Sequence, residues 1–148
     1  MRRPLWAVLA AFCAAGCTTA VPGTPVAVKR ADGSEVVLSY FTALNDAGEQ
    51  GADKQAEFLR RTQHPDFDDR VCDLDGLVLS MAPVADTLRP DPQWKPEKSA
   101  DVPRGETFVI AVTVTIRQGT TTIGEQIGSQ RVVLLDGEAY GFTPCPAS

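Results

Sequence analysis

The single histidine of the sequence, His64, lies in an acidic stretch whose residue types could support acid–base or metal chemistry. It opens the run His64-Pro65-Asp66-Phe67-Asp68-Asp69. A histidine beside carboxylates can act as a general base or bind a metal ion. One histidine with irregularly spaced carboxylates is too small a ligand set for zinc, and the spacing lacks the register of a calcium loop. We therefore predict a solvated turn here, with no metal, no cofactor and no catalytic residue.

The N-terminal segment has the pattern of an export signal. Arg2 and Arg3 precede an uninterrupted apolar run over residues 5–15. Such a helix spans about 16 Å, too short for the roughly 30 Å hydrocarbon core of a membrane, so a signal peptide over residues 1–16 fits better. The run ends in Ala14-Ala15-Gly16-Cys17, which resembles the lipobox of bacterial lipoprotein precursors. That resemblance implies cleavage after Gly16 and a diacylglycerol group on Cys17; ordinary secretion with cleavage near Ala15 is the alternative.

The charge of the chain limits its partners. The formal net charge is −5, and no basic run follows the first three residues, which argues against nucleic-acid binding. Removal of residues 1–16 leaves 12 basic and 19 acidic residues, a formal charge of −7. An acidic chain is not held on anionic lipid by its charge, so attachment depends on the acyl chains at Cys17. We expect residues 17–33 to be a flexible tether on the extracytoplasmic face of the cell membrane.

Two further cysteines remain once Cys13 is removed with the signal peptide and Cys17 carries lipid. Cys72 follows the predicted helices, and Cys145 lies between two prolines near the C-terminus. Two cysteines of an exported chain are candidates for a disulfide. A redox-active pair is the alternative, but the chain lacks the Cys-x-x-Cys spacing typical of one. We therefore predict a structural Cys72–Cys145 bridge.

The hydrophobic pattern predicts one α+β domain over residues 34–148, with helices first and an antiparallel sheet after them. The first helix has an apolar face and ends near Gly48; the face consists of Val36, Val37, Tyr40, Phe41, Leu44 and Ala47. A second helix is expected over residues 52–63, with Ala52, Ala56 and Leu59 on one side. Residues 66–101 show no clear period, and we expect a short helix or strand near residues 71–81 followed by a long connection.

The C-terminal third has the alternation of β-strands. Residues 108–116 place Phe108, Ile110, Val112, Val114 and Ile116 on one face. A turn at residues 118–119 leads into a second strand over residues 120–135, with Gly124 and Gly128 as expected bends or bulges. Asp136-Gly137 predicts a two-residue hairpin turn before a last strand over residues 138–143.

Two stretches resemble nuclear transport factor 2-like domains, also called cystatin-like cones. They are Tyr40-Phe41-Thr42-Ala43-Leu44-Asn45 in the first helix and the Asp136-Gly137-Glu138 turn. In that family helices pack into the concave side of a curved sheet and often leave a pocket. With the lipobox and tether in front, the chain is similar to small cell-envelope lipoproteins of actinobacteria built on this cone.

Tyr40 and Trp94 are the candidate pocket residues. Tyr40 corresponds in position to the tyrosine that donates to the oxyanion in the ketosteroid-isomerase branch of the family. That chemistry also needs carboxyl groups in the pocket, and the apolar strand face over residues 108–116 offers none. A core role is therefore the favoured interpretation of Tyr40. Trp94, in the segment Pro92-Gln93-Trp94-Lys95-Pro96, either borders a pocket, binds a peptide, or packs in the core or against a loop, and packing is favoured.

These observations favour a non-enzymatic, lipid-anchored envelope protein that binds an apolar small molecule or another envelope protein. A pocket enzyme of isomerase or dehydratase type that uses Tyr40 is one alternative. A structural or antigen-like surface protein without a ligand is the other, and a cavity of about 300 Å³ or more between helices and sheet would count against it.

Overall fold

The computed structural model describes residues 33–145. The signal peptide, Cys17 and nearly all of the tether lie outside the described residues. Within residues 33–145, no helix is both long enough and apolar enough to cross a membrane.

Two α-helices and a short 3-10 helix form one layer of the fold. They are α1 (Ser34–Glu49), α2 (Ala52–Arg61) and η1 (Pro65–Arg70). The predicted face of α1 is confirmed at Val37, Tyr40, Phe41 and Leu44, which are all buried. Val36 is 36% exposed, so its assignment to that face was wrong.

The ends of the helices differ from the prediction. Gly48 is a buried residue inside α1 and does not terminate it; a Cβ there would collide with the side chain of Gln55. α2 ends at Arg61 and buries Gln55, Phe58 and Leu59. The buried face of α2 therefore differs from the predicted one. The prediction included Leu59 but omitted Gln55 and Phe58.

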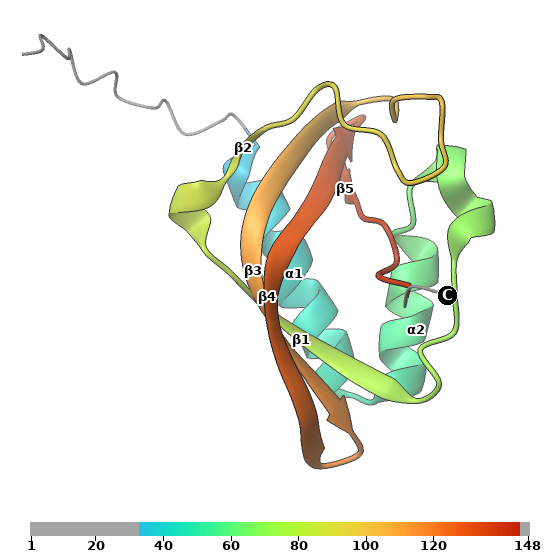
Figure 1. Ribbon diagram of the computed structural model, residues 1–148, viewed down its shortest axis with the longest axis vertical. Coiled ribbons are helices and arrows are strands. Elements are labelled where there is room, and N and C mark those ends of the chain that lie inside the picture. The colour runs from blue at the N-terminus through green and yellow to red at the C-terminus, as the bar shows by residue number, and fades with distance from the viewer. Residues whose placement is uncertain (1–32, 146–148) are drawn as a thin grey trace, which may run out of the picture.

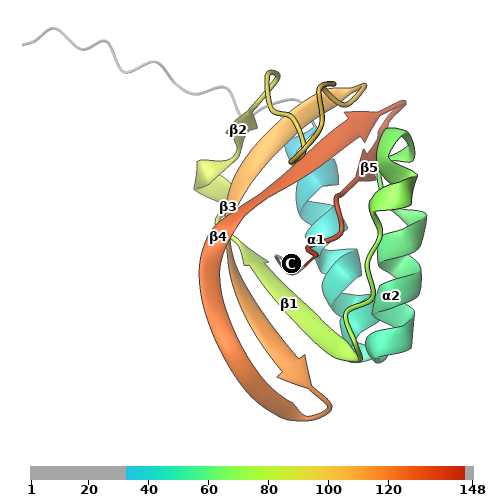
Figure 2. The ribbon, with the colours of Figure 1, turned by 45° about the vertical axis from the view of Figure 1, so that its right-hand side comes forward.

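The second layer is a strongly curled antiparallel sheet against which the helices pack (Figures 1 and 2). The long strands are β3 (Glu106–Gln118) and β4 (Thr121–Leu135), with β5 (Glu138–Tyr140) at the far edge of β4. Two strands share the other edge of β3: β1 (Leu77–Pro83) and the short β2 (Arg89–Pro90). A 3-10 turn, η2 (Ala85–Thr87), lies between them. The α+β class with helices on a curved sheet is confirmed.

The predicted strand face of β3 forms the floor of the core. Phe108, Ile110, Val112 and Val114 are buried against α1, α2 and Val132 of β4. The Asp136-Gly137 turn is also confirmed, since φ is 53° and 85° at these residues, as a tight hairpin turn of this kind requires. The last strand is shorter than predicted and ends at Tyr140, after which Gly141 bridges to Gln63.

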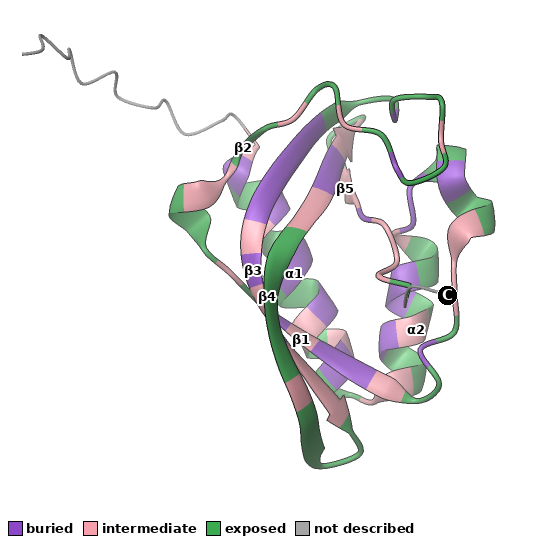
Figure 3. Cartoon of the chain, viewed as in Figure 1, coloured by how far each residue is buried: buried purple, intermediate pink, exposed green. Residues whose placement is uncertain are grey.

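The distal half of the β3–β4 hairpin extends away from the helices. The register of the β3–β4 pair shifts between Ile116 and Arg117, opposite Gly124. The sequence predicted a bend or bulge at this glycine. Figure 3 shows the outer part of β4 as exposed, and Ile123 and Ile127 are 54% and 85% exposed. The outer part of β4 therefore extends beyond the packed core.

Candidate functional site

A cavity of about 340 Å³ opens where the concave face leaves the core. Strand β1, the distal halves of β3 and β4, the loop 73–75 and the C-terminal segment form its walls. Its apolar lining consists of Leu74, Leu77, Leu79, Met81, Val114, Ile116 and Pro144. Its polar lining consists of Asp73, Asp75, Gln126 and Gln130. Such a site holds a small molecule mainly by burying its apolar surface.

Two amide side chains hold the β1 wall of the cavity in place. Gln55 of α2 accepts from the Leu79 N–H at 2.8 Å and donates to the Leu79 carbonyl at 2.7 Å. Asn45 of α1 likewise accepts from the Met81 N–H and donates to the Met81 carbonyl, each at 2.8 Å. Each amide therefore completes the hydrogen bonds of one β1 residue, as a neighbouring strand would.

Neither amide was predicted from the sequence as a functional residue. Gln55 lies three and four residues before Phe58 and Leu59, and Asn45 follows Leu44 on the inner side of its helix. A polar residue within an apolar helix face was the available signal, because a buried amide requires hydrogen-bond partners.

The predicted disulfide is confirmed and attaches the C-terminal segment to the cavity wall. Cys72 and Cys145 are bonded, with their Cα atoms 5.7 Å apart. Cys145 and Pro144 line the cavity, and Figure 2 shows this end of the chain inside the curl of the sheet. The segment is also fixed by Gln63, whose Oε1 accepts from the Thr143 N–H at 2.8 Å. The C-terminal segment is thus a fixed wall of the site.

Tyr40 lies in the closed core and does not line the 340 Å³ cavity. Its ring contacts Phe41 and Phe58, with ring centres 5.5 and 5.4 Å apart. The space beside it is only about 10 Å³. Burial raises the pKa of Tyr40 to about 12, partly offset by a hydrogen bond with the Thr62 side chain. This geometry is that of a core aromatic residue.

Trp94 packs on the C-terminal segment, away from Tyr40. Its ring centre is 4.7 Å from that of Phe142, and the Arg131 guanidinium lies 5.3 Å from it. Trp94 borders a broad surface depression of about 860 Å³, which shares Gln130, Pro144 and Cys145 with the apolar cavity. The two candidate pocket residues are therefore not brought together in one site.

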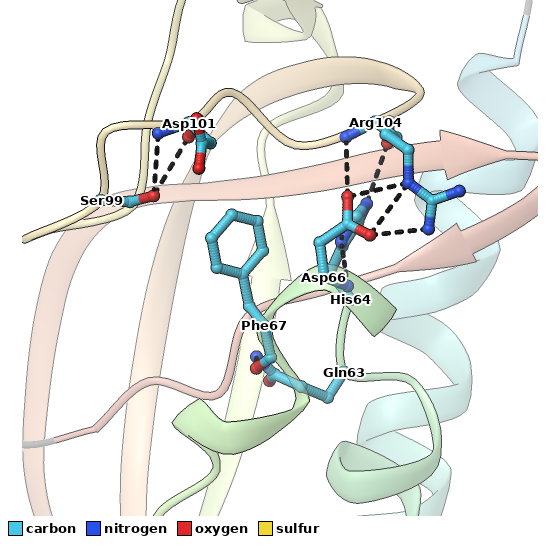
Figure 4. A network of polar contacts seen from close by, with 7 residues as sticks. All are labelled: Gln63, His64, Asp66, Phe67, Ser99, Asp101 and Arg104. Atoms are coloured by element: carbon cyan, nitrogen blue, oxygen red, sulfur yellow. Dashed lines mark hydrogen bonds and ion pairs between the residues drawn. The ribbon is translucent and has the colours of Figure 1, made fainter.

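His64 is fully buried, so the predicted solvated turn was wrong at this residue. Its Nδ1 accepts from the Asp66 N–H at 3.2 Å, and its Nε2 lies 2.9 Å from the Arg104 carbonyl (Figure 4). With Nδ1 as the acceptor, Nε2 is the ring nitrogen that can donate to the Arg104 carbonyl. The ring also stacks on Phe142. Residues distant in sequence cover His64, which the local acidic pattern did not indicate.

The carboxylate beside His64 is engaged in an ion pair. Asp66 accepts from Arg104 Nε at 2.9 Å and from Nη2 at 2.6 Å (Figure 4). These hydrogen bonds from Arg104 lower the pKa of Asp66. The pair secures the loop before β3 against η1. It does not bring a carboxylate to Tyr40.

Residues 33–145 contain no group of three or more histidine, cysteine, aspartate or glutamate side chains suited to a metal ion. Comparison with protein families, curated proteins and solved structures found no match to this chain.

Proposed function

We propose that this protein is a lipid-anchored, extracytoplasmic binding protein that holds an apolar small molecule in the 340 Å³ cavity without catalysing a reaction. The observation that carries the proposal is the apolar wall formed by β1 and the distal half of β3. A cavity of this size falls within the range of small-molecule sites, roughly 300–1,000 Å³. This cavity lies between the sheet, the loop 73–75 and the C-terminal segment, and none of its lining residues belongs to α1 or α2. The space between the helices and the sheet is only about 10 Å³, so the large cavity that would count against a purely structural role is not found there in the described residues.

Export and anchoring are proposed from the sequence, and one structural feature supports export. The sequence Ala14-Ala15-Gly16-Cys17 resembles a lipobox. The Cys72–Cys145 disulfide suits an oxidising compartment outside the cytoplasm. Two acyl chains on Cys17 would suffice for stable anchoring of an acidic chain.

The enzymatic alternative has less support. An isomerase or dehydratase using Tyr40 needs an open space at the hydroxyl and a carboxyl group nearby. The space beside Tyr40 holds about one water molecule, and Asp66 is paired with Arg104. We therefore do not propose a catalytic role for Tyr40.

Ligand binding can be followed at one atom of the cavity wall. The sequence has two methionines, Met1 and Met81, and the proposed cleavage removes Met1. Labelling with ¹³C-methyl methionine then gives a single resonance, from Met81 in the cavity. Titration of the nanodisc-held protein with 1-decanol should shift this resonance in a saturable way. An unchanged resonance up to the solubility limit would contradict ligand binding.

A matched pair of variants tests where the ligand binds. Ile116→Trp fills the cavity and should abolish the shift of the Met81 methyl group. Ile123→Trp makes the same change at an exposed residue that does not line the cavity, and it should bind as the unmodified chain does. Equal loss in both variants would argue against the cavity as the site.

Lipidation is tested separately in cells. An alkyne fatty acid should label the unmodified chain and leave Cys17→Ser unlabelled. Equal labelling of both would remove the anchoring part of the proposal while leaving the ligand site untouched.

A second candidate function is binding of another envelope protein along β4. Strand β5 pairs only with Val133–Leu135, so in the described structure the preceding part of β4 has β3 on one side alone. Ile123 and Ile127 are exposed on this stretch. An exposed strand edge can pair with an extended segment of a partner. A photo-crosslinking residue in place of Ile127 should then yield a discrete adduct in cells, and the same residue in place of Lys54 should not.

A further inference from the structure

The charges around the cavity are of one sign. Asp73 and Asp75 line it, Gln126 and Gln130 add neutral amides, and no lysine or arginine is among its described lining residues. Arg60 and Arg70 line two adjoining surface depressions, of which the first shares Asp73 with the cavity, but neither arginine lines the cavity itself. A ligand seated on the apolar wall therefore meets carboxylate and amide groups at its polar end.

The two carboxylates are carried by a loop whose position is fixed. Between them Leu74 is buried in the core, and directly before them Cys72 is bonded to Cys145. Asp73 Oδ1 accepts from the Asp75 N–H at 2.9 Å, and Asp75 has a left-handed backbone with φ of 51°. Both anchors hold the loop beside the cavity, and the two carboxylates lie at its solvent-exposed rim, where a positively charged group of a bound molecule would be attracted to them.

We propose that the ligand is a hydrophobic amine, with an apolar body and one positively charged end. This inference rests on the proposed ligand-binding function and narrows it to a chemical class. A cavity of about 150 Å³ holds one benzene molecule, so 340 Å³ accommodates about a dozen non-hydrogen atoms. The apolar body lies against Leu79, Met81 and Ile116, and the ammonium group lies toward Asp73 and Asp75.

Three probes with the same ten-carbon chain test this charge preference. They are decylamine, 1-decanol and decanoate, which at pH 7 are cationic, neutral and anionic. Each is titrated below its micelle concentration into the nanodisc-held protein, with the Met81 methyl resonance as readout and empty nanodiscs to correct for partitioning. We expect the amine to bind about tenfold or more tightly than decanoate, with the alcohol between them.

A double variant and a charge-matched control assign the preference to the two carboxylates. Asp73→Asn combined with Asp75→Asn keeps the loop, because asparagine retains the acceptor at 73 and tolerates the left-handed conformation at 75. This double variant should bind decylamine and decanoate with similar affinity, and its affinity for 1-decanol should be unchanged. Glu35→Gln combined with Asp86→Asn alters the net charge equally at exposed residues away from the cavity and should preserve the preference.

The outcomes separate the two proposals. If all three probes bind with similar affinity, the amine inference is overturned and the apolar binding function stands. The inference also fails if the control variant equalises the probes as strongly as the double variant. If no probe shifts the Met81 resonance, the binding function itself fails.

Discussion

The side-chain amide of Gln55 has a testable role in holding β1 to the helices. Gln55 is fully buried and makes three hydrogen bonds: two with the Leu79 backbone and one to the Leu44 carbonyl at 3.1 Å. Gln55→Leu keeps the size of the side chain and removes all three. We expect β1, and with it one wall of the cavity, to lose much of its support.

The magnitude follows from the groups that are left without partners. The N–H and carbonyl of Leu79 each lose a buried partner, at a cost of about 1–3 kcal/mol each. The Leu44 carbonyl lies inside α1 and keeps its helical partner. Burial of the added leucine side chain offsets about 1 kcal/mol. The free energy of unfolding should therefore fall by about 3 kcal/mol, a large part of the 5–15 kcal/mol of an ordinary domain.

Urea denaturation followed by circular dichroism measures this loss. Gln50→Leu is the matched control, because Gln50 is exposed and makes a single side-chain hydrogen bond, to Asp46. It should change stability by no more than about 0.5 kcal/mol. Asn45→Leu, at the partly buried equivalent contact to Met81, should fall between the two. A loss for Gln55→Leu no larger than that for Gln50→Leu would refute this account of how β1 is held.

Three other measurements test separate parts of the structure. Reduction of the disulfide, which closes a loop of 73 residues, should lower the free energy of unfolding by up to about 4 kcal/mol, and the non-reduced chain should be two hydrogens lighter by mass. Because the pKa of Tyr40 is raised from 10.0 to about 12, the folded chain keeps between these pH values a proton that the unfolded chain loses. Stability should be unaffected below pH 10 and fall by about 1.4 kcal/mol per pH unit between pH 10 and about pH 12, and alkaline denaturation curves of Tyr40→Phe should lack this slope. Gly137→Ala adds a Cβ that meets no neighbour but must adopt φ of 85°, so thermal unfolding should show a loss of about 1–2 kcal/mol, whereas Gly128→Ala, which has the same open space and no such φ, should show less.

The sequence predicted the elements whose pattern is carried by residues close together in the chain. The face of α1 repeats every three to four residues, and the large apolar residues of β3 recur at every second position from Phe108 to Ile116, so each pattern identified the element and its core-facing side. Val109, on the other side of β3, is buried as well. The Asp136-Gly137 turn follows from the preference of these two residue types for positive φ.

Strand β1 was predicted only as a short helix or strand near residues 71–81, because its partners are far away. It pairs with residues 112–118 of β3 on one edge and with the amides of Asn45 and Gln55 on the other. The burial of His64 likewise depends on Arg104 and Gly141. Both are too far from His64 in the sequence for a local periodic pattern to indicate these contacts.

The candidate site was not predictable for the same reason. Its walls come from residues 73–81, 114–130 and 144–145, which only the folded sheet brings together. The disulfide was predictable, since it followed from counting the cysteines of a chain whose N-terminal sequence predicts export. What the count did not indicate is that the bridge places Cys145 at the cavity.

The cross-link also determines what a protease would leave behind. Between β2 and β3, residues 91–105 are largely exposed and without regular structure, which makes this connection the natural place for a first cut. A chain severed there yields one fragment that contains Cys72 and another that contains Cys145. The fragments would remain covalently joined and would separate on a gel only after reduction. None of the lining residues of the cavity lies in residues 91–105, so a chain cleaved once there would keep all of them in one covalently joined molecule.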